Sequence, residues 1–144
     1  EYAMKVGLPK PIVISHHMMF GLKEGQAKMS KSDPDSAIFI EDSEKDVKRK
    51  ISGAYCPNTV IKENPILDYI KHIIFGFGNE FLVKWSEKYG GDWLYTSYEE
   101  LEQEFAADKM DAGDLKTSLA REINKLLQPV RDHFSNNEEA KALL

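Results

Sequence analysis

The sequence predicts a mainly α-helical fold, in which a helical domain with one β-hairpin is attached to the edge of an α/β domain. From residue 43 onward, apolar residues recur three and four positions apart, which is the period of a helix packed on one side. Residues 1–42 contain two short apolar runs separated by a long polar loop. This pattern is typical of one edge of an α/β domain whose remaining strands are absent. We therefore expect two domains, residues 1–42 and residues 43–144.

The first domain is expected to contribute mainly extended segments. Residues 1–5 resemble neither a signal peptide nor a translation start and look like the tail of a helix, so part of a longer protein is expected. The β-branched run at 11–14 predicts a buried strand that ends near Ser15. A second short extended run is expected at 37–40. If strand 11–14 lacks its neighbours, its side chains will be exposed along an unpaired edge.

Two helices are expected next, each with its own start signal. Ser43 can cap a helix with Asp46 in its first turn, and Cys56-Pro57 would end it. Asn64-Pro65 supplies the N-cap and the first residue of the following helix. That helix carries an apolar stripe, and Gly76 is expected to end it.

A β-hairpin is expected after these helices. The apolar runs at 81–83 and 93–95 flank Gly90-Gly91, and glycines suit the tight turn between two strands. Ser97 and Glu100 then form the pattern of a capping box, which predicts a helix with Tyr98, Leu101 and Phe105 on one face.

The longest periodic signal is the last one. Apolar residues at helical spacing extend from 115 to 134 and predict a helix of about five turns. Pro129 lies inside this run and is expected to kink or interrupt it. A short closing helix is expected over 138–144. The stripe consists of Leu115, Leu119, Ile123, Leu126, Val130 and Phe134.

Composition places the chain among ordinary globular proteins. Of its 144 residues 42% are hydrophobic and 30% charged, and no apolar run approaches the roughly 20 residues that cross a bilayer. Cys56 is the only cysteine, so an intrachain disulfide is excluded and a reducing, cytoplasmic location is expected. The net charge of −5 argues against sequence-blind binding of nucleic acid. It leaves open an RNA partner held by a few contacts over a local basic patch.

The sequence gives no sign of a metal site in this segment. His16 and His17 are adjacent, so an extended chain would direct them to opposite faces. His72 and His133 are isolated positions on helical patterns, and Cys56 has no partner at metal-ligand spacing.

The strongest chemical signal is the basic loop from Lys28 to Ser32. It reads KMSKS and lies between Gly25 and Asp33-Pro34-Asp35, which are turn-forming residues. Two ammonium groups three residues apart can close on a polyphosphate, while hydroxyls and backbone N–H groups complete its hydrogen bonding. From these residues alone, a solvated basic loop is an equally good interpretation.

Three stretches together resemble one enzyme family. The first stretch consists of residues 14–22 together with the KMSKS loop and Asp33 at 28–33. The second is KYGGD, within residues 87–92. The third is DLK at 114–116, which opens the helix that reaches residues 124–131. In this order they resemble the C-terminal half of tyrosyl-tRNA synthetases of the archaeal and eukaryotic kind. The loop alone would fit any class I synthetase, whereas the KYGGD and DLK stretches favour the tyrosyl member.

The resemblance implies an ATP site in residues 1–42, on the edge of a truncated Rossmann-like catalytic domain. Lys28 and Lys31 would be the catalytic pair that stabilises charge on the departing pyrophosphate, with Lys31 in direct phosphate contact. Met18 and Met19 would lie by the adenine, and core packing is an equally open interpretation for them. ATP is expected as substrate, accompanied by Mg²⁺. The expected ATP-binding residues are Met18, Met19, Lys28, Met29, Ser30, Lys31 and Ser32.

The resemblance also implies that residues 43–144 form a helical anticodon-binding domain. Tyr89 would stack on the first anticodon base, and Asp114 would accept hydrogen bonds from guanine. Without the resemblance, hairpin packing for Tyr89 and an N-terminal helix cap for Asp114 are the favoured interpretations. The family's usual His-Pro pair is replaced here by Asp111-Ala112-Gly113, which puts a phosphate-repelling carboxylate near the anticodon.

The expected function is therefore that of a tyrosine–tRNA ligase, with tRNA(Tyr), ATP and tyrosine as partners. The HIGH signature is not in these residues, so this segment is expected to be inactive alone, with the tyrosine pocket in the N-terminal half. The full-length enzyme is expected to be a homodimer and the segment a monomer. The alternative is a non-catalytic RNA-binding or signalling module derived from a synthetase. A P-loop nucleotide binder is disfavoured, because G-x-x-x-x-G-K-[ST] is absent.

Overall fold

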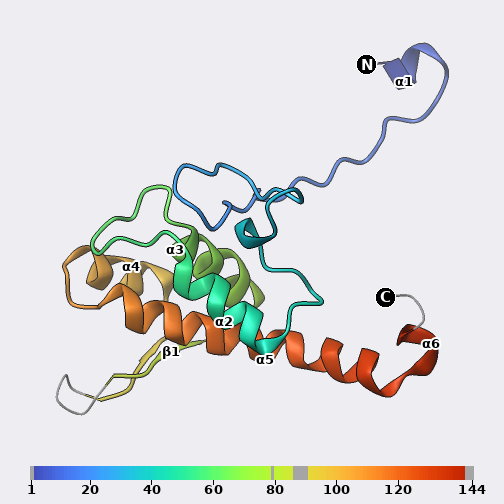
Figure 1. The fold of residues 1–144 in the computed structure, drawn as a ribbon. Helices are drawn as coiled ribbons and strands as arrows, with labels where there is room; N and C mark the ends of the chain where they lie inside the picture. The colour runs from blue at the N-terminus through green and yellow to red at the C-terminus, as the bar shows by residue number, and fades with distance from the viewer. Residues whose placement is uncertain (1, 79, 86–90, 142–144) are drawn as a thin grey trace.

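The computed structural model describes residues 2–78, 80–85 and 91–141, and these form a mostly helical fold with one two-stranded sheet, as predicted. Helices α2 to α5 pack together in Figure 1, while an N-terminal segment leads away to α1 (Tyr2–Lys5) and the end of α5 runs beyond the body. No helix among the described residues is both long and apolar enough to cross a membrane.

Helix α2 (Glu44–Gly53) begins where the sequence predicts. The Ser43 hydroxyl accepts a hydrogen bond from the Asp46 N–H at 3.2 Å, which satisfies one of the free donors of the first turn. The helix ends at Gly53, before Cys56-Pro57, and buries Val47, Lys50 and Ile51.

Helix α3 (Pro65–Tyr69) is capped by Asn64, whose side-chain oxygen accepts from two N–H groups of the first turn. The helix does not end at Gly76. It continues as the π-helical stretch η2 (Ile70–Ile74) and the 3₁₀ turn η3 (Phe75–Phe77). Gly78 ends it, because a φ of +73° lies in the left-handed region that favours glycine.

The predicted hairpin is confirmed for its strands. Strand β1 (Phe81–Val83) pairs antiparallel with β2 (Trp93–Tyr95), with Leu82 opposite Leu94. Gly91 has a φ of +79°, which suits a turn glycine, whereas Gly90 lies outside the described residues.

Helix α4 (Tyr98–Ala106) has the predicted buried face but not the predicted capping box. Tyr98, Leu101 and Phe105 are buried. The Ser97 side chain is turned toward the Glu99 carboxylate, to which its hydroxyl donates at 2.9 Å, and it makes no capping bond to the backbone.

Helix α5 (Ala112–Asn136) is continuous through Pro129, so the predicted interruption is wrong. Only its first half is core: Leu115 and Leu119 are fully buried, whereas Leu126 is 40% exposed. Leu127 still packs against the core and Arg131 donates to the Asp42 carbonyl at 3.0 Å, whereas the end of α5 runs beyond the body (Figure 1). The short α6 (Glu138–Lys141) agrees with the predicted closing helix.

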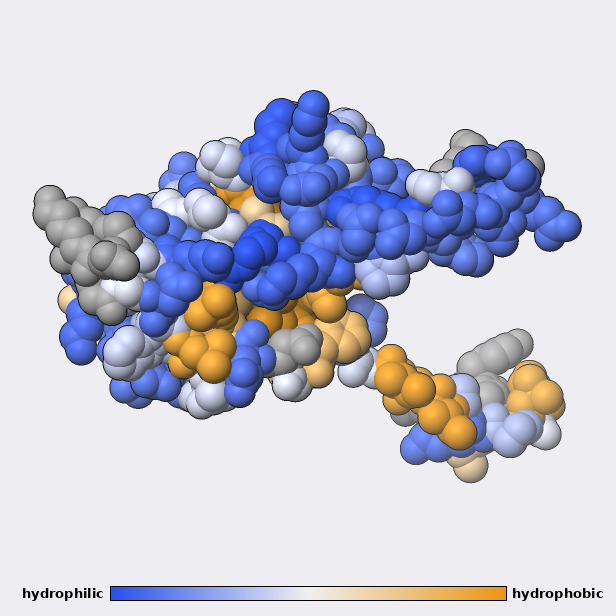
Figure 2. Space-filling view, turned by 90° about the horizontal axis from the view of Figure 1, so that it is seen from below, coloured by the Kyte–Doolittle hydropathy of each residue, from blue (hydrophilic) through white to orange (hydrophobic). Residues whose placement is uncertain are grey.

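The predicted strand at 11–14 is wrong. The segment has no strand structure, and Ile12, Val13 and Ile14 are 93%, 78% and 88% exposed. In Figure 2, hydrophobic side chains of the N-terminal segment stand apart from the body. The run at 37–40, expected to be extended, is extended at Ala37 but enters a turn, in which the Phe39 N–H bonds the Asp42 carboxylate at 2.8 Å. A strand needs a neighbouring strand to pair its backbone groups, and neither strand of the described sheet pairs with either run.

The polar loop of the N-terminal part is attached to the helical core through Leu22. Leu22 is 1% exposed and belongs to the same core cluster as α2, α3 and α5. Its N–H donates to the Ser36 carbonyl at 2.9 Å, and its carbonyl accepts from the Tyr55 N–H at 2.7 Å. The loop that follows Leu22 is therefore held at both ends against the helices.

Candidate functional site

The Lys28–Ser32 loop is anchored by a buried hydroxyl that no sequence pattern indicated. Ser36, in the 3₁₀ turn η1 (Pro34–Ser36), is 0% exposed. Its Oγ accepts from the Ser30 N–H at 3.0 Å and lies 3.0 Å from the Ser30 carbonyl and 2.7 Å from that of Asp33. One serine thus fixes both ends of the turn that carries Lys31.

Met29 is the apolar anchor of the same loop. It packs against the core, and the buried Tyr69 hydroxyl lies 3.9 Å from its sulfur. Lys28 and Lys31, on either side of it, are exposed, and neither forms an ion pair among the described residues. The Ser30 and Ser32 hydroxyls lie 2.8 Å apart. The loop therefore presents two available ammonium groups on a backbone that is already fixed.

The acidic residues after the loop are neutralised by other cations. The Lys23 ammonium lies 2.7 Å from the Asp33 carboxylate and, with Gln26, holds the pKa of that carboxyl below its usual value. Arg49 of α2 binds Asp35 at 2.8 Å. Lys28 and Lys31 are thus left available for an incoming anion.

The two methionines before the loop differ in their surroundings. Met19 is half-buried and packs against the core, which supports the core-packing interpretation for this residue. Met18 is 64% exposed, so its side chain is available to a ligand.

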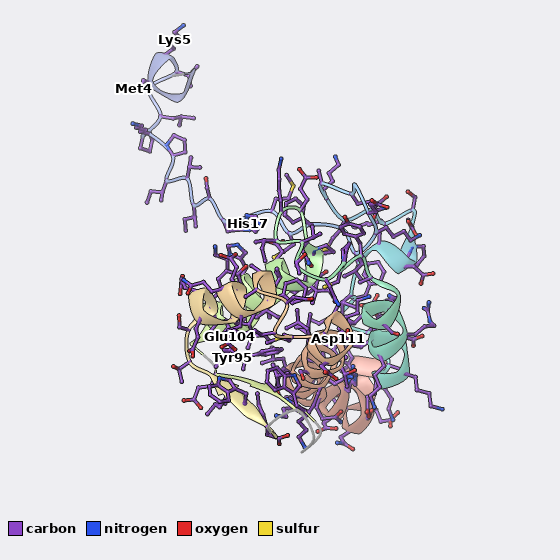
Figure 3. All side chains as sticks on the ribbon, turned by 90° about the vertical axis from the view of Figure 1, so that its left-hand side faces the viewer. Met4, Lys5, His17, Tyr95, Glu104 and Asp111 are labelled. Carbon is purple, nitrogen blue, oxygen red and sulfur yellow. The ribbon has the colours of Figure 1, made fainter. Side chains whose placement is uncertain are left out.

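A second candidate site lies at the start of α5. A pocket of about 510 Å³ is formed where the end of β1, the residues before α5 and its first turn meet. Figure 3 labels Asp111 at this end of α5. The pocket is lined by Asn58, Trp85, Asp108, Lys109, Met110, Asp111 and Asp114.

Asp111, and not Asp114, caps α5. The Asp111 carboxylate accepts from the Gly113 N–H at 2.7 Å and from the Asn58 side chain at 3.4 Å. Asn58 in turn accepts from the Ala112 N–H at 2.9 Å. The capping interpretation of Asp114 is therefore wrong, because its neighbour already fills that position.

Asp114 consequently faces the pocket without a capping role. Burial, and then the charge of Asp111, raise the pKa of its carboxyl. A partly desolvated carboxylate beside another carboxylate costs stability and is ready to gain from hydrogen-bond donors. Tyr89, the other predicted base contact, lies outside the described residues. Trp85 is a pocket aromatic that sequence reasoning missed; its position just after β1 is a signal that could have found it.

A cationic groove of about 880 Å³ lies along α2 and α5. Among the described residues it shares no lining residue with the Asp114 pocket, although Lys84 and Gly113 of the groove directly precede Trp85 and Asp114 of the pocket in the sequence. Such a groove can follow a phosphate backbone even though the whole chain is acidic. Its cationic residues are Lys48, Lys84, Lys116, Arg121 and Lys125.

The chain matches, over residues 1–128, the family model described as tRNA synthetases class I (W and Y). It is 53% identical over 135 residues to Tyrosine–tRNA ligase 1, cytoplasmic, of Arabidopsis thaliana, which covers 94% of this chain and 35% of that protein. It is 39% identical over 160 residues to Tyrosine–tRNA ligase of Saccharolobus solfataricus, with all of this chain and 44% of that protein covered.

Solved structures that resemble this chain are also tyrosyl-tRNA synthetases. The Leishmania major tyrosyl-tRNA synthetase in complex with tyrosinol superposes with a TM-score of 0.85 at 45% identity, covering 99% of this chain and 26% of that one. The Pyrococcus horikoshii tyrosyl-tRNA synthetase complexed with L-tyrosine gives 0.80 at 37% identity, with 89% and 39% covered. The chain thus spans less than half the length of the relatives it matches.

Proposed function

The chain belongs to the class I tRNA synthetases of the tryptophanyl and tyrosyl family, and we propose that it is the part of a tyrosine–tRNA ligase that supplies the ATP loop and reads the anticodon. The ligase would use ATP to activate tyrosine and would transfer the tyrosyl group to tRNA(Tyr). Residues 1–42 would be the margin of the catalytic domain, and residues 43–144 the anticodon-binding domain. The tyrosine pocket and the homodimer interface are assigned to the rest of the full-length protein, in the cytoplasm.

The ATP role rests on the two available lysines of the loop. Lys28 and Lys31 are exposed, while Met29 between them and Ser36 behind them hold the backbone. Cations fixed in place before the reaction stabilise charge that develops on the leaving pyrophosphate, at little reorganisation cost. Mg²⁺ would accompany the ATP phosphates.

In the full-length ligase, Lys31→Ala is expected to lower the rate of tyrosyl-adenylate formation by about 10²-fold, the scale of losing one preorganised charge contact. Lys45→Ala, an exposed lysine on α2 away from the loop, serves as the control and should leave the rate unchanged. Equal rates for the two variants would show that Lys31 has no role in the catalytic step.

The anticodon role rests on one observation above all: Asp114 lines the pocket and Asp111 does the capping. A carboxylate can accept from the two Watson–Crick donors of guanine, whereas adenine offers it no matching pair. Trp85 supplies an aromatic face on which an unstacked base can lie. The cationic groove along α2 and α5 would suit phosphates of the same RNA.

The test is a binding titration with two tyrosine anticodon stem-loops, one with G and one with A at the first anticodon position. At moderate salt the chain should prefer G by at least tenfold, about 1.4 kcal/mol, and Asp114→Asn should remove the preference. Asp108→Asn is a matched control, since Asp108 lines the same pocket without belonging to α5. A preference that survives Asp114→Asn would contradict the assignment of Asp114.

A further inference from the structure

Three potential metal ligands far apart in the sequence meet at one point of the fold. His17, from the segment before the ATP loop, hydrogen-bonds the Asp68 carboxylate through Nε2 at 2.7 Å. The Nε2 atom of His72 lies 3.6 Å from the same oxygen, Oδ1. One potential ligand atom from each residue lies within 4.8 Å of the other two. His72 is therefore not isolated, because the fold brings His17 to it from 55 residues away (72 minus 17).

The Asp68 carboxylate is held in an orientation that suits a metal ligand. Its side chain is only 7% exposed, and its second oxygen, Oδ2, accepts from the Phe20 N–H at 2.9 Å. A backbone donor on one carboxylate oxygen fixes the group and leaves the other directed at the two imidazoles, as in many metal sites.

The backbone beneath these residues is unusual. Asp68 lies in α3 and His72 in the π-helical stretch η2, four residues later. Four residues return a helix to nearly the same face, so both side chains project to the same side. Single π-helical turns inside longer helices are frequent at functional sites.

The distances suit a small divalent ion. In a tetrahedral site with bonds of about 2.0–2.1 Å, ligand atoms lie about 3.3 Å from one another. The observed values of 2.7 Å and 3.6 Å fall on either side of that value. The His17 and His72 rings stack at 4.0 Å between centroids with 19° between their planes. Because the lone pair of each ring nitrogen lies in its ring plane, these nearly parallel rings would have to tilt apart substantially before both nitrogens could bind one ion.

We propose that His17, Asp68 and His72 form a binding site for a divalent transition-metal ion, best matched by Zn²⁺. Two imidazoles and one carboxylate are a typical zinc ligand set, and the fourth position would hold water. Mg²⁺ and Ca²⁺ prefer oxygen ligands throughout, and only one carboxylate is present here. The two imidazole side chains are 38% and 35% exposed, so the ion can enter from solvent.

The site would fasten the ATP-loop segment to the helical body. Figure 3 shows His17 where the N-terminal segment reaches the helices, next to Met18 and Met19 in the sequence. The ammonium of neighbouring Lys71 lies over the Tyr98 ring, 4.7 Å from the centroid. Metal binding would thus stabilise the position of this segment, independently of any tRNA contact.

The test is a titration of the chain with Co²⁺, whose visible absorption reports a tetrahedral site, followed by displacement with Zn²⁺. One Zn²⁺ per chain is expected, and His72→Ala should weaken binding at least tenfold. His16→Ala is the matched control, since His16 is adjacent in sequence but outside the cluster, and it should bind like the parent. Asp68→Asn provides a second variant that keeps the acceptor for the Phe20 N–H.

Circular dichroism would verify that each variant is folded. Loss of the Co²⁺ spectrum in folded His72→Ala or Asp68→Asn, together with its retention in His16→Ala, would support the site. Absence of a tetrahedral Co²⁺ spectrum in the parent chain, or equal binding by all variants, would overturn the proposal and leave the three residues as a hydrogen-bonded cluster. Anticodon binding is measured separately, so failure here does not affect the proposed function.

Discussion

Replacing Lys50 tests how the ATP-loop region is held on the helical body. Lys50 is buried on α2, and its ammonium lies 2.8 Å and 2.7 Å from the two Asp42 oxygens and 3.1 Å from the Ala37 carbonyl. The two side chains are 4% and 11% exposed. Lys50→Met removes the cation and leaves the Asp42 carboxylate buried without a counter-ion. Breaking a buried ion pair in this way lowers the free energy of unfolding by about 3–5 kcal/mol. We expect about 3 kcal/mol, because Asp42 keeps some contact with solvent and its hydrogen bond from the Phe39 N–H.

Urea unfolding followed by circular dichroism measures this loss. With a denaturant slope of about 1–3 kcal/mol per molar urea, the midpoint should fall by roughly 1–3 M. Lys48→Met is the matched control on the same helix, since Lys48 pairs with Glu44 on the exposed surface, and it should change stability by less than about 0.5 kcal/mol. Adding Asp42→Asn to Lys50→Met should recover part of the loss, because no buried charge then remains. A strictly additive double variant, or a Lys50→Met loss no larger than that of Lys48→Met, would refute this reasoning.

Three further outcomes are expected. Burial and the charge of Asp111 raise the pKa of Asp114, so the stability that its protonated carboxyl contributes is complete below the unfolded-state pKa and is lost as the pH rises through the folded-state pKa. Asp114→Asn should therefore raise the melting temperature at pH 7, and near pH 3 the melting temperatures of the variant and the parent should converge. A variant that melts below the parent at pH 7 would contradict this. In urea unfolding, Leu119→Ala should cost about 2–5 kcal/mol and Leu126→Ala, at a half-exposed site, well under half of that; equal losses would be inconsistent with the burial pattern of α5. Asn64→Ala should cost about 1–2 kcal/mol in the same assay, because two helical N–H groups lose their acceptor, and an unchanged midpoint would show the cap to be dispensable.

Most features that depend on neighbouring residues were predictable from the sequence, the capping box at Ser97 being an exception. Ser43 and Asn64 start their helices where the pattern places them, because a cap acts within its own first turn. The strands of the hairpin and the buried face of α4 follow in the same way from local alternation and helical spacing. The KMSKS loop was recognisable for a similar reason, since its chemistry lies in five consecutive residues.

Features that depend on distant partners were not predictable. The run at 11–14 has the residues of a strand, but its structure depends on neighbouring strands that the described residues do not provide. The helix passes Gly76 because the glycine that adopts a left-handed φ is Gly78, two residues further on. The buried pair of Lys50 with Asp42 joins residues that look like ordinary surface charges in the sequence.

The candidate anticodon site shows the same division. The DLK pattern identified Asp114, but the sequence could not decide between capping and base contact, because Asp111 and Asp114 are both acceptable caps. Only the fold, through Asn58 and its bond to the Ala112 N–H, assigns the cap to Asp111. Trp85 enters the pocket for a comparable reason, since its location depends on how β1 meets the start of α5.

The structure also bears on how the two candidate sites are joined. Leu22, Met29 and Ile38 come from the region assigned to the catalytic margin, yet they belong to or pack against the core formed by α2, α3 and α5. The Lys50 ion pair crosses the same border at residue 42. The loop with Lys28 and Lys31 and the pocket with Asp114 therefore share one packed body, and close-packed interiors transmit displacements between their surfaces. If the loop and the pocket have the proposed roles, a substitution that shifts α2 or α5 would affect both ATP-dependent activation and anticodon binding, even though neither lysine lines the pocket.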